Sequence, residues 1–118
     1  MKKRVVVIGS GLSAKNYLEH FMSDSTLVAI LDSFGEGSID NIQVQKIDHI
    51  THIEFDQVII ASWAVDELAS QLNAFNVPKH KISIFLNDKA QTVSLTHWQL
   101  KIADARQPAI DDVLYAFY

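Results

Sequence analysis

Five short stretches of mainly apolar, often β-branched residues recur along the chain. They lie at residues 4–8, 27–31, 42–47, 55–61 and 82–86. The first and second are nearly continuous apolar runs, a pattern typical of strands that are buried on both faces of a parallel sheet, and the fourth is apolar at its centre. The third alternates imperfectly through Ile42, Val44 and Ile47, so it predicts a shorter strand.

Two segments between these strands have the spacing of amphipathic helices. Residues 13–22 and 66–75 each gather apolar side chains on one side, and the second ends before Pro78, which cannot continue a helix. These apolar positions are Leu18, Phe21 and Met22 in the first helix and Leu68, Leu72 and Phe75 in the second. Strands that alternate with helices predict parallel βαβ units. We therefore expect a doubly wound α/β domain with helices flanking a mainly parallel five-stranded sheet of order 3-2-1-4-5.

The stretch at residues 33–41 contains two glycines and predicts a loop. Residues 93–102 fit either a strand with a phase slip near Trp98 or a helix that places Leu95 and Trp98 on one face. Residues 108–118 predict a helix, because Pro108 comes early and apolar residues follow at helical spacing.

Size and composition fit one globular domain. With 118 residues, of which 48% are hydrophobic, we treat residues 1–118 as a single domain, with a core at 4–87 and a C-terminal extension at 88–118. The lack of cysteine excludes disulfides and thiolate metal sites. The net charge is −4 and basic residues cluster only at the start, which argues against nucleic acid as a partner. No apolar run approaches the ~20 residues of a membrane span, so we expect a cytoplasmic protein and no membrane partner.

The strongest motif is Gly9-Ser10-Gly11-Leu12-Ser13-Ala14, which matches G-x-G-x-x-G/A between a predicted buried strand and a predicted helix. In such a turn, Gly9 permits the tight bend, Gly11 lets a phosphate approach the backbone, and Ala14 lets the helix pack closely on the strand. The helix N-terminus offers unpaired N–H groups to an anion, and the hydroxyls of Ser10 and Ser13 add donors. The alternative is a glycine turn that joins strand to helix and binds nothing.

Asp32 follows Gly11 by about 20 residues and ends the second predicted strand. A carboxylate there accepts hydrogen bonds from ribose hydroxyls and repels a 2′-phosphate, which favours NAD over NADP. Alternatively, Asp32 caps the following loop through backbone hydrogen bonds.

Ser62 and Trp63 follow the fourth predicted strand, beside the point where the strand order reverses and ligands bind in open parallel sheets. Ser62 is positioned to donate to phosphate, and Trp63 to stack on a base or sugar. The alternative for Trp63 is packing against the sheet edge or under the next helix.

Four segments together resemble a known domain family: residues 5–11, 28–32, 41–44 and 56–62. They are similar to the Rossmann-like nucleotide- or CoA-binding domain at the N-terminus of bacterial nucleotide-sugar dehydratases and epimerases of polysaccharide biosynthesis. They also resemble the N-terminal domain of sugar acyltransferases that hold a UDP-sugar, and of some sugar-modifying methyltransferases. Asn41 stands where that family usually has glycine. The resemblance implies a Rossmann-like fold that binds a nucleotide.

We therefore predict a binding protein for a small-molecule nucleotide, either NAD or a nucleotide-sugar, linked to sugar or surface-polysaccharide metabolism. The sequence lacks a Tyr-x-x-x-Lys pair, a P-loop and a G-x-S-x-G elbow, and we expect neither a metal site nor catalysis by the isolated chain. Two alternatives stay open. One is an interaction module without ligand, whose aromatic tail at Tyr115, Phe117 and Tyr118 contacts a partner or a second copy. The other is an NAD-dependent enzyme completed by another subunit.

Overall fold

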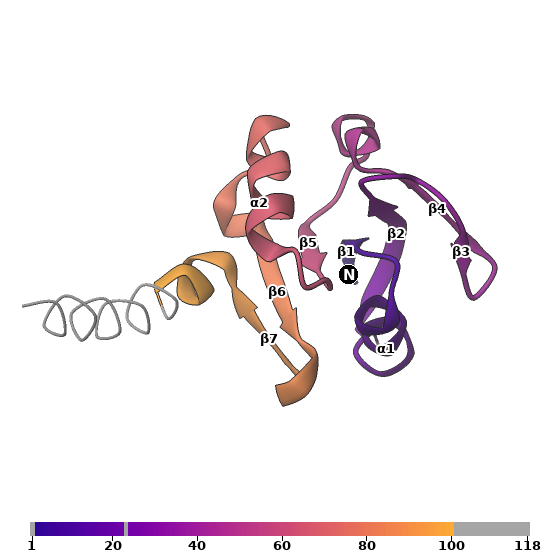
Figure 1. Ribbon diagram of the computed structural model, residues 1–118, viewed down its shortest axis with the longest axis horizontal. Coiled ribbons are helices and arrows are strands. Elements are labelled where there is room, and N and C mark those ends of the chain that lie inside the picture. Colours follow the sequence, from indigo (N-terminus) through magenta and orange to yellow (C-terminus); the bar gives the residue numbers. More distant parts are fainter. Residues whose placement is uncertain (1, 23, 101–118) are drawn as a thin grey trace, which may run out of the picture.

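A computed structural model describes residues 2–22 and 24–100 and contains one seven-stranded sheet (Figure 1). Along the sheet the strands follow the order β3-β4-β2-β1-β5-β6-β7. Their bounds are β1 Lys3–Ile8, β2 Ser25–Asp32, β3 Ser38–Ile39, β4 Ile42–Lys46, β5 Gln57–Ile60, β6 Ile82–Leu86 and β7 Gln91–Ser94.

The five inner strands are parallel and stand in the order that the apolar pattern predicts. The sheet as a whole differs from the prediction, because an antiparallel strand is added at each edge: β3 pairs with β4, and β7 pairs with β6. The prediction of a loop over residues 33–41 was wrong at Ser38 and Ile39, which form β3. A two-residue strand has no detectable alternation, so its pairing depends on the turn that follows, where Asp40 and Asn41 both have positive φ.

Two α-helices connect parallel strands, α1 (Leu12–His20) and α2 (Val65–Ala74), and both begin one residue before their predicted starts. Single-turn and longer 3₁₀ helices complete the connections: η1 Ile47–His52, η2 Lys79–Lys81 and η3 Asn87–Lys89. The two interpretations of residues 93–102 each hold in part, since β7 ends at Ser94 and residues 95–100 are helical. The change is sharp because the Ser94 hydroxyl accepts the His97 N–H at 3.0 Å as an N-cap.

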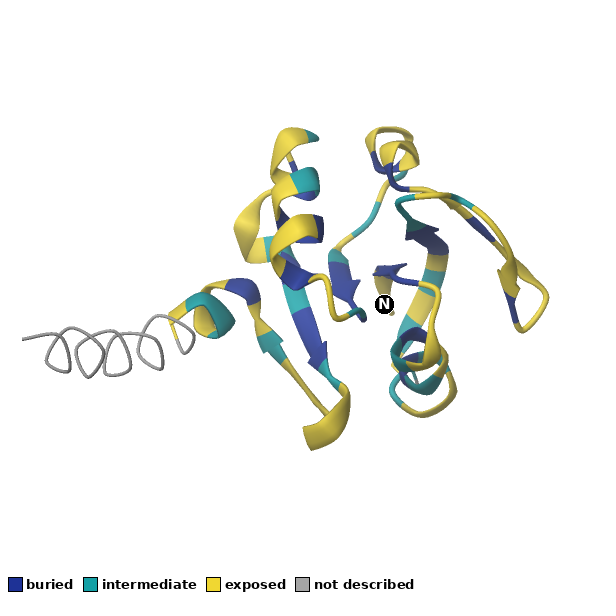
Figure 2. Cartoon of the chain, viewed as in Figure 1, coloured by how far each residue is buried: buried dark blue, intermediate teal, exposed yellow. Residues whose placement is uncertain are grey.

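The helices cover opposite faces of the sheet (Figure 1). Alternate residues of β1 show this directly: Val6 and Ile8 pack with α2, whereas Val5 and Val7 pack with α1. All four of these side chains are essentially inaccessible, which explains the continuous apolar run of this strand. Figure 2 shows the same distribution, with buried residues in the central strands and exposed residues on the outer faces of the helices.

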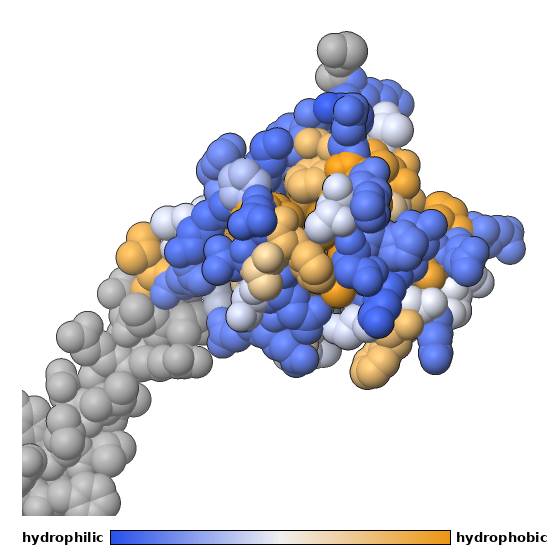
Figure 3. Space-filling model, turned by 90° about the horizontal axis from the view of Figure 1, so that it is seen from above, coloured by the Kyte–Doolittle hydropathy of each residue, from blue (hydrophilic) through white to orange (hydrophobic). Residues whose placement is uncertain are grey.

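An aromatic cluster holds α1 against the sheet. Tyr17 meets the ring of Phe85 edge-on with centroids 5.2 Å apart, and Phe21 lies 4.9 Å from the same ring. On the other face, Ile53, Phe55 and Phe75 are partly buried against the α2 core. The surface seen from above is largely hydrophilic with apolar side chains gathered near its middle (Figure 3).

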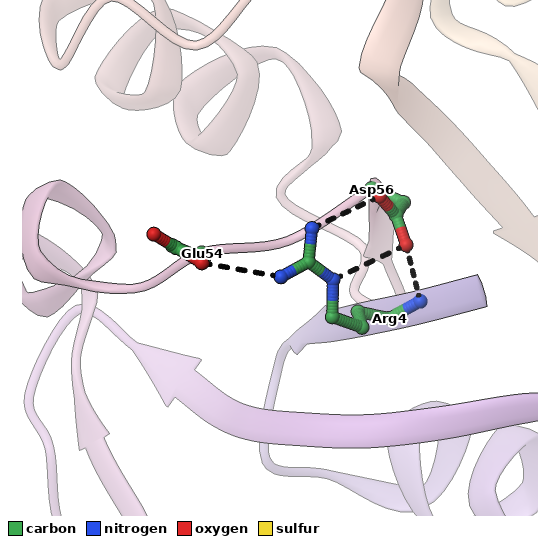
Figure 4. Close-up of polar contacts among 3 residues, drawn as sticks. All are labelled: Arg4, Glu54 and Asp56. Carbon is green, nitrogen blue, oxygen red and sulfur yellow. Dashed lines mark hydrogen bonds and ion pairs between the residues drawn. The ribbon is translucent and has the colours of Figure 1, made fainter. Parts of the chain in front are cut away.

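An ion-pair cluster joins β1 to the segment before β5, at the amino ends of the strands (Figure 4). The Arg4 guanidinium donates to Asp56 Oδ1 at 3.3 Å and to Glu54 Oε2 at 3.3 Å, while the Arg4 backbone N–H donates to Asp56 Oδ2 at 2.8 Å. The side-chain hydrogen bonds from Arg4 lower the pKa of Asp56 below its ordinary 3.8. The cluster therefore favours the ionised form of Asp56 in the folded protein.

This lowered pKa predicts how Asp56→Asn changes stability with pH. The contribution of a carboxyl group whose pKa falls on folding is complete above its ordinary pKa and is lost as the pH falls through the lowered value. We expect the variant to melt slightly below the wild type at pH 7, because exposed ion pairs contribute little. The deficit should shrink as the pH is taken below 3.8. Thermal unfolding followed by circular dichroism measures both, and a deficit that grows with acidity would contradict this assignment.

The predicted helix over residues 108–118, with its aromatic residues Tyr115, Phe117 and Tyr118, and residues 101–102 of the 93–102 segment lie outside the described residues. Within the described ranges, no helix is both long and apolar enough to cross a membrane.

Candidate functional site

The turn from β1 to α1 is fixed by two neighbouring strand ends. The Gly9 N–H donates to the Leu31 carbonyl oxygen at 2.8 Å, and the Ala61 N–H donates to the Ile8 carbonyl oxygen at 2.8 Å. Gly9 has φ +130°, and a Cβ there would lie 2.3 Å from the Ala61 carbonyl oxygen. Gly9 is therefore required for the tight turn, as its position in the motif predicts, and it is itself buried beneath the turn.

Gly11 differs from Gly9 in its exposure, its backbone conformation and the space around it. It is exposed, its φ of −96° is ordinary, and no atom lies within 4 Å of a Cβ placed on it. It is the N-cap of α1, and no side chain caps this helix end. No side chain therefore accepts from the N–H groups of the first turn of α1, and the positive end of the helix dipole is not neutralised by an acidic residue in that turn. Ala14 is fully buried and lets α1 pack closely on the sheet, as predicted.

Asp32 ends β2 and binds both to the turn and to its own loop. Its Oδ2 accepts the Ser10 hydroxyl at 2.7 Å, which brings together two residues that the sequence assigned to one site. Its Oδ1 accepts the backbone N–H of Phe34 at 3.0 Å and that of Gly35. Asp32 therefore caps the following loop, as the alternative interpretation of the sequence predicted. The half-buried carboxylate also stands beside the glycine turn.

Ser62 and Trp63 follow β5 on the other side of the turn. The Ser62 hydroxyl oxygen accepts the Ala64 N–H at 3.3 Å, immediately before α2. Trp63 is 96% exposed, so its predicted alternative, packing at the sheet edge or under the next helix, is wrong.

Two clefts open beside the start of α1, at the carboxyl ends of the strands. One, of about 320 Å³, is lined by Ser10, Gly11, Leu12, Lys15, Ser38 and Asp40, and we call it the hairpin cleft. The other, of about 330 Å³, is lined by Ser13, Ser62, Trp63, Asn87, Asp88 and Trp98, and we call it the tryptophan cleft. The strand order reverses between β1 and β5, so the clefts flank the switch point of the sheet. Each volume lies at the lower end of the range for small-molecule sites.

Six of these lining residues were missed by the sequence prediction: Lys15, Ser38, Asp40, Asn87, Asp88 and Trp98. Lys15 lies one turn into α1, where a basic residue four positions after the second glycine was the available signal. Asn87 and Asp88 follow the carboxyl end of β6, the same edge that suggested Ser62, and extending that rule to the fifth predicted strand would have found them. No such signal in the sequence indicated Trp98. Its place at the cleft depends on the pairing of the antiparallel strand β7 with β6.

The described residues contain no group of three histidine, aspartate or glutamate side chains arranged to hold a metal ion. Tyr17, the tyrosine of α1, lies in the core, where burial raises the pKa of its hydroxyl. It is therefore poorly placed for proton transfer at the sheet edge. What the site offers is a set of backbone donors, one lysine and two clefts, which suits binding of an anion with groups on either side.

The parallel inner strands, the glycine turn and the two-sided helix cover define a Rossmann-like α/β domain. Residues 1–83 match the model of the C2185-like, N-terminal family, which spans more than half of the chain, and this protein belongs to that family.

The fold is shared with a solved structure, UDP-D-quinovosamine 4-dehydrogenase from Vibrio fischeri. The similarity has a TM-score of 0.59 at 13% sequence identity and covers 81% of this chain and 97% of that chain. At this identity the similarity establishes a common fold. No curated protein matches the sequence.

Proposed function

We propose that this domain binds a nucleotide through its diphosphate, with NAD and nucleotide-sugars as the ligand classes that fit. One observation carries the proposal: the N-terminus of α1 has no side-chain cap and opens between two clefts at the switch point of the sheet. Backbone N–H groups and the helix dipole favour an anion there, and a diphosphate has a substituent at each end to occupy the clefts.

The charges around the turn support this orientation. Lys15 adds a cation in the hairpin cleft close to Gly11. Asp32 and Asp40 lie on the same side, where carboxylates accept ribose hydroxyls and repel a 2′-phosphate. The nucleoside is therefore assigned to the hairpin cleft, and a ligand without a 2′-phosphate is preferred.

The context of the fold supports a link to sugar metabolism. The structural neighbour acts, by its name, on a UDP-sugar, and the sequence resembles binding domains of polysaccharide-biosynthesis enzymes. We infer binding rather than catalysis for the isolated chain, because both clefts are open and hydride transfer requires that the nicotinamide and its substrate be enclosed and positioned.

A ligand-induced shift in thermal unfolding tests this function. A nucleotide present at 100 times its dissociation constant should stabilise the protein by about 2.7 kcal/mol. UDP-glucose, GDP-mannose, ADP-glucose and NAD are the probes. If none of them changes the melting temperature at millimolar concentration, the proposal is wrong.

A matched pair of variants tests the role of Asp32. Asp32→Asn keeps an oxygen that can accept the loop N–H groups but loses the charge, so it should weaken nucleotide binding about tenfold. Asp56→Asn makes the same chemical change at the amino ends of the strands, on the opposite side from the glycine turn. It should leave the ligand-induced shift unchanged. Equal losses in the two variants would argue against a ribose contact at Asp32.

A further inference from the structure

Trp63 is the most exposed of the large apolar side chains of the described residues, and it is placed beside a cleft. It is 96% exposed, whereas Trp98, across the same cleft, packs partly against the α2 core. The chain contains two tryptophans, and both line the tryptophan cleft. An exposed indole is stabilised when a ligand covers one of its faces, because the covered apolar surface is removed from water.

The rim of the cleft is polar, and its groups suit hydroxyls. The Asn16 amide donates to Asn87 Oδ1, which orients the Asn87 side chain and leaves its amide nitrogen as the donor for a ligand. Asp88 adds a carboxylate that only accepts hydrogen bonds. Ser62 accepts from the backbone through its oxygen and retains its hydroxyl proton for donation.

Charge excludes one class of occupant. The carboxylate of Asp88 disfavours a second phosphate or a carboxylate in this cleft. A neutral ring with several hydroxyls on its edge and an apolar C–H face meets both the indole and the rim. A hexopyranose has this combination.

The cleft borders the proposed phosphate position through Ser13. Ser13 lies in the first turn of α1 and also lines the tryptophan cleft. A group esterified to a diphosphate at the N-terminus of α1 would therefore enter this cleft directly.

We propose that the tryptophan cleft binds the hexopyranose of a nucleotide-sugar, with the apolar face of the ring on Trp63 and its hydroxyls on Asn87 and Asp88. This inference rests on the proposed function, since the diphosphate at α1 delivers the sugar. It narrows the ligand from nucleotides in general to nucleotide-sugars and makes Trp63 the residue that distinguishes them from nucleoside diphosphates.

The two tryptophans provide the measurement, because intrinsic fluorescence reports on this cleft alone. The 118-residue protein is titrated with UDP-glucose, GDP-mannose and ADP-glucose, with the corresponding diphosphates UDP, GDP and ADP, and with NAD. At least one nucleotide-sugar should change the fluorescence. Isothermal titration calorimetry then gives the affinities of the variants: Trp63→Ala should weaken that nucleotide-sugar about tenfold and its diphosphate less than twofold.

Two further variants separate stacking from general damage. Trp63→Phe keeps an aromatic face and should retain most of the affinity for the nucleotide-sugar. Phe34→Ala removes an exposed aromatic ring that does not line this cleft, and the ratio of the two affinities should stay at its wild-type value. Circular dichroism confirms that each variant is folded.

The outcomes distinguish this inference from the function on which it rests. If Trp63→Ala weakens nucleotide-sugar and diphosphate equally, or neither, nucleotide binding stands and the sugar site is wrong. If NAD alone depends on Trp63, the cleft holds a nicotinamide and the sugar site is also wrong. If no probe binds, both proposals fall.

Discussion

Replacing Gly9 with alanine is expected to destabilise the protein by roughly 2–5 kcal/mol. The added methyl group would lie 2.3 Å from the Ala61 carbonyl oxygen, and the residue would have to keep φ +130°. Backbone atoms surround this position, because the Gly9 N–H binds Leu31 and the neighbouring strand end binds Ile8. The clash therefore cannot be relieved by rotating a side chain. The loss is a large fraction of the stability of a typical domain.

Chemical denaturation of Gly9→Ala beside the wild type measures this loss. A midpoint that moves by less than the equivalent of about 1 kcal/mol would show that the β1–α1 turn is looser than described, since ordinary surface substitutions stay within that range. Gly11→Ala is the matched control. Its methyl group would enter open space at an ordinary φ, so its stability should stay close to that of the wild type.

Gly11→Asp is expected to leave the fold intact and to remove nucleotide binding, with a loss of affinity of at least about 100-fold. Aspartate is a favoured N-cap residue, so it should stabilise α1 slightly relative to glycine. The same carboxylate would occupy the N–H groups at the helix start and repel a phosphate. The variant therefore separates folding from binding at one position.

Isothermal titration calorimetry with the nucleotide that shifts the melting temperature gives the affinity of Gly11→Asp. Gly11→Ala serves again as the control, because it adds a side chain without a charge and should bind considerably better than the aspartate variant. Unchanged binding in Gly11→Asp would mean that the anion does not approach the α1 N-terminus.

The central part of the fold could be predicted from the sequence because burial leaves a clear pattern. The continuous run from Val5 to Ile8 is apolar since both faces of β1 are covered. The edge strands carry no such pattern. β3 has two residues, and β7 is mostly exposed and depends on its pairing with β6. Local periodicity cannot report a pairing that only the folded sheet provides.

The part of the candidate site that lies within the β1–α1 connection could be predicted from the sequence. The parts that bring several connections together were predicted less well. The glycine turn is local, so its geometry follows from its motif, and Asp32 was found by its spacing from that motif. The hydrogen bond from Ser10 to Asp32 and the placement of Trp63 and Trp98 at one cleft both involve distant segments. The exposure of Trp63 agrees with its predicted place at the edge of the site, whereas the alternative that it packs inside was wrong.

The most direct test is a ¹H–¹⁵N spectrum of the protein recorded during titration with the nucleotide that gives the largest thermal shift. The backbone amides of residues 10–14 should show the largest changes, followed by those around Asp32 and Trp63, while Lys3 and Arg4 at the opposite ends of the strands should not move. Changes centred on Lys3 and Arg4, or none at residues 10–14, would contradict an anion site at the start of α1.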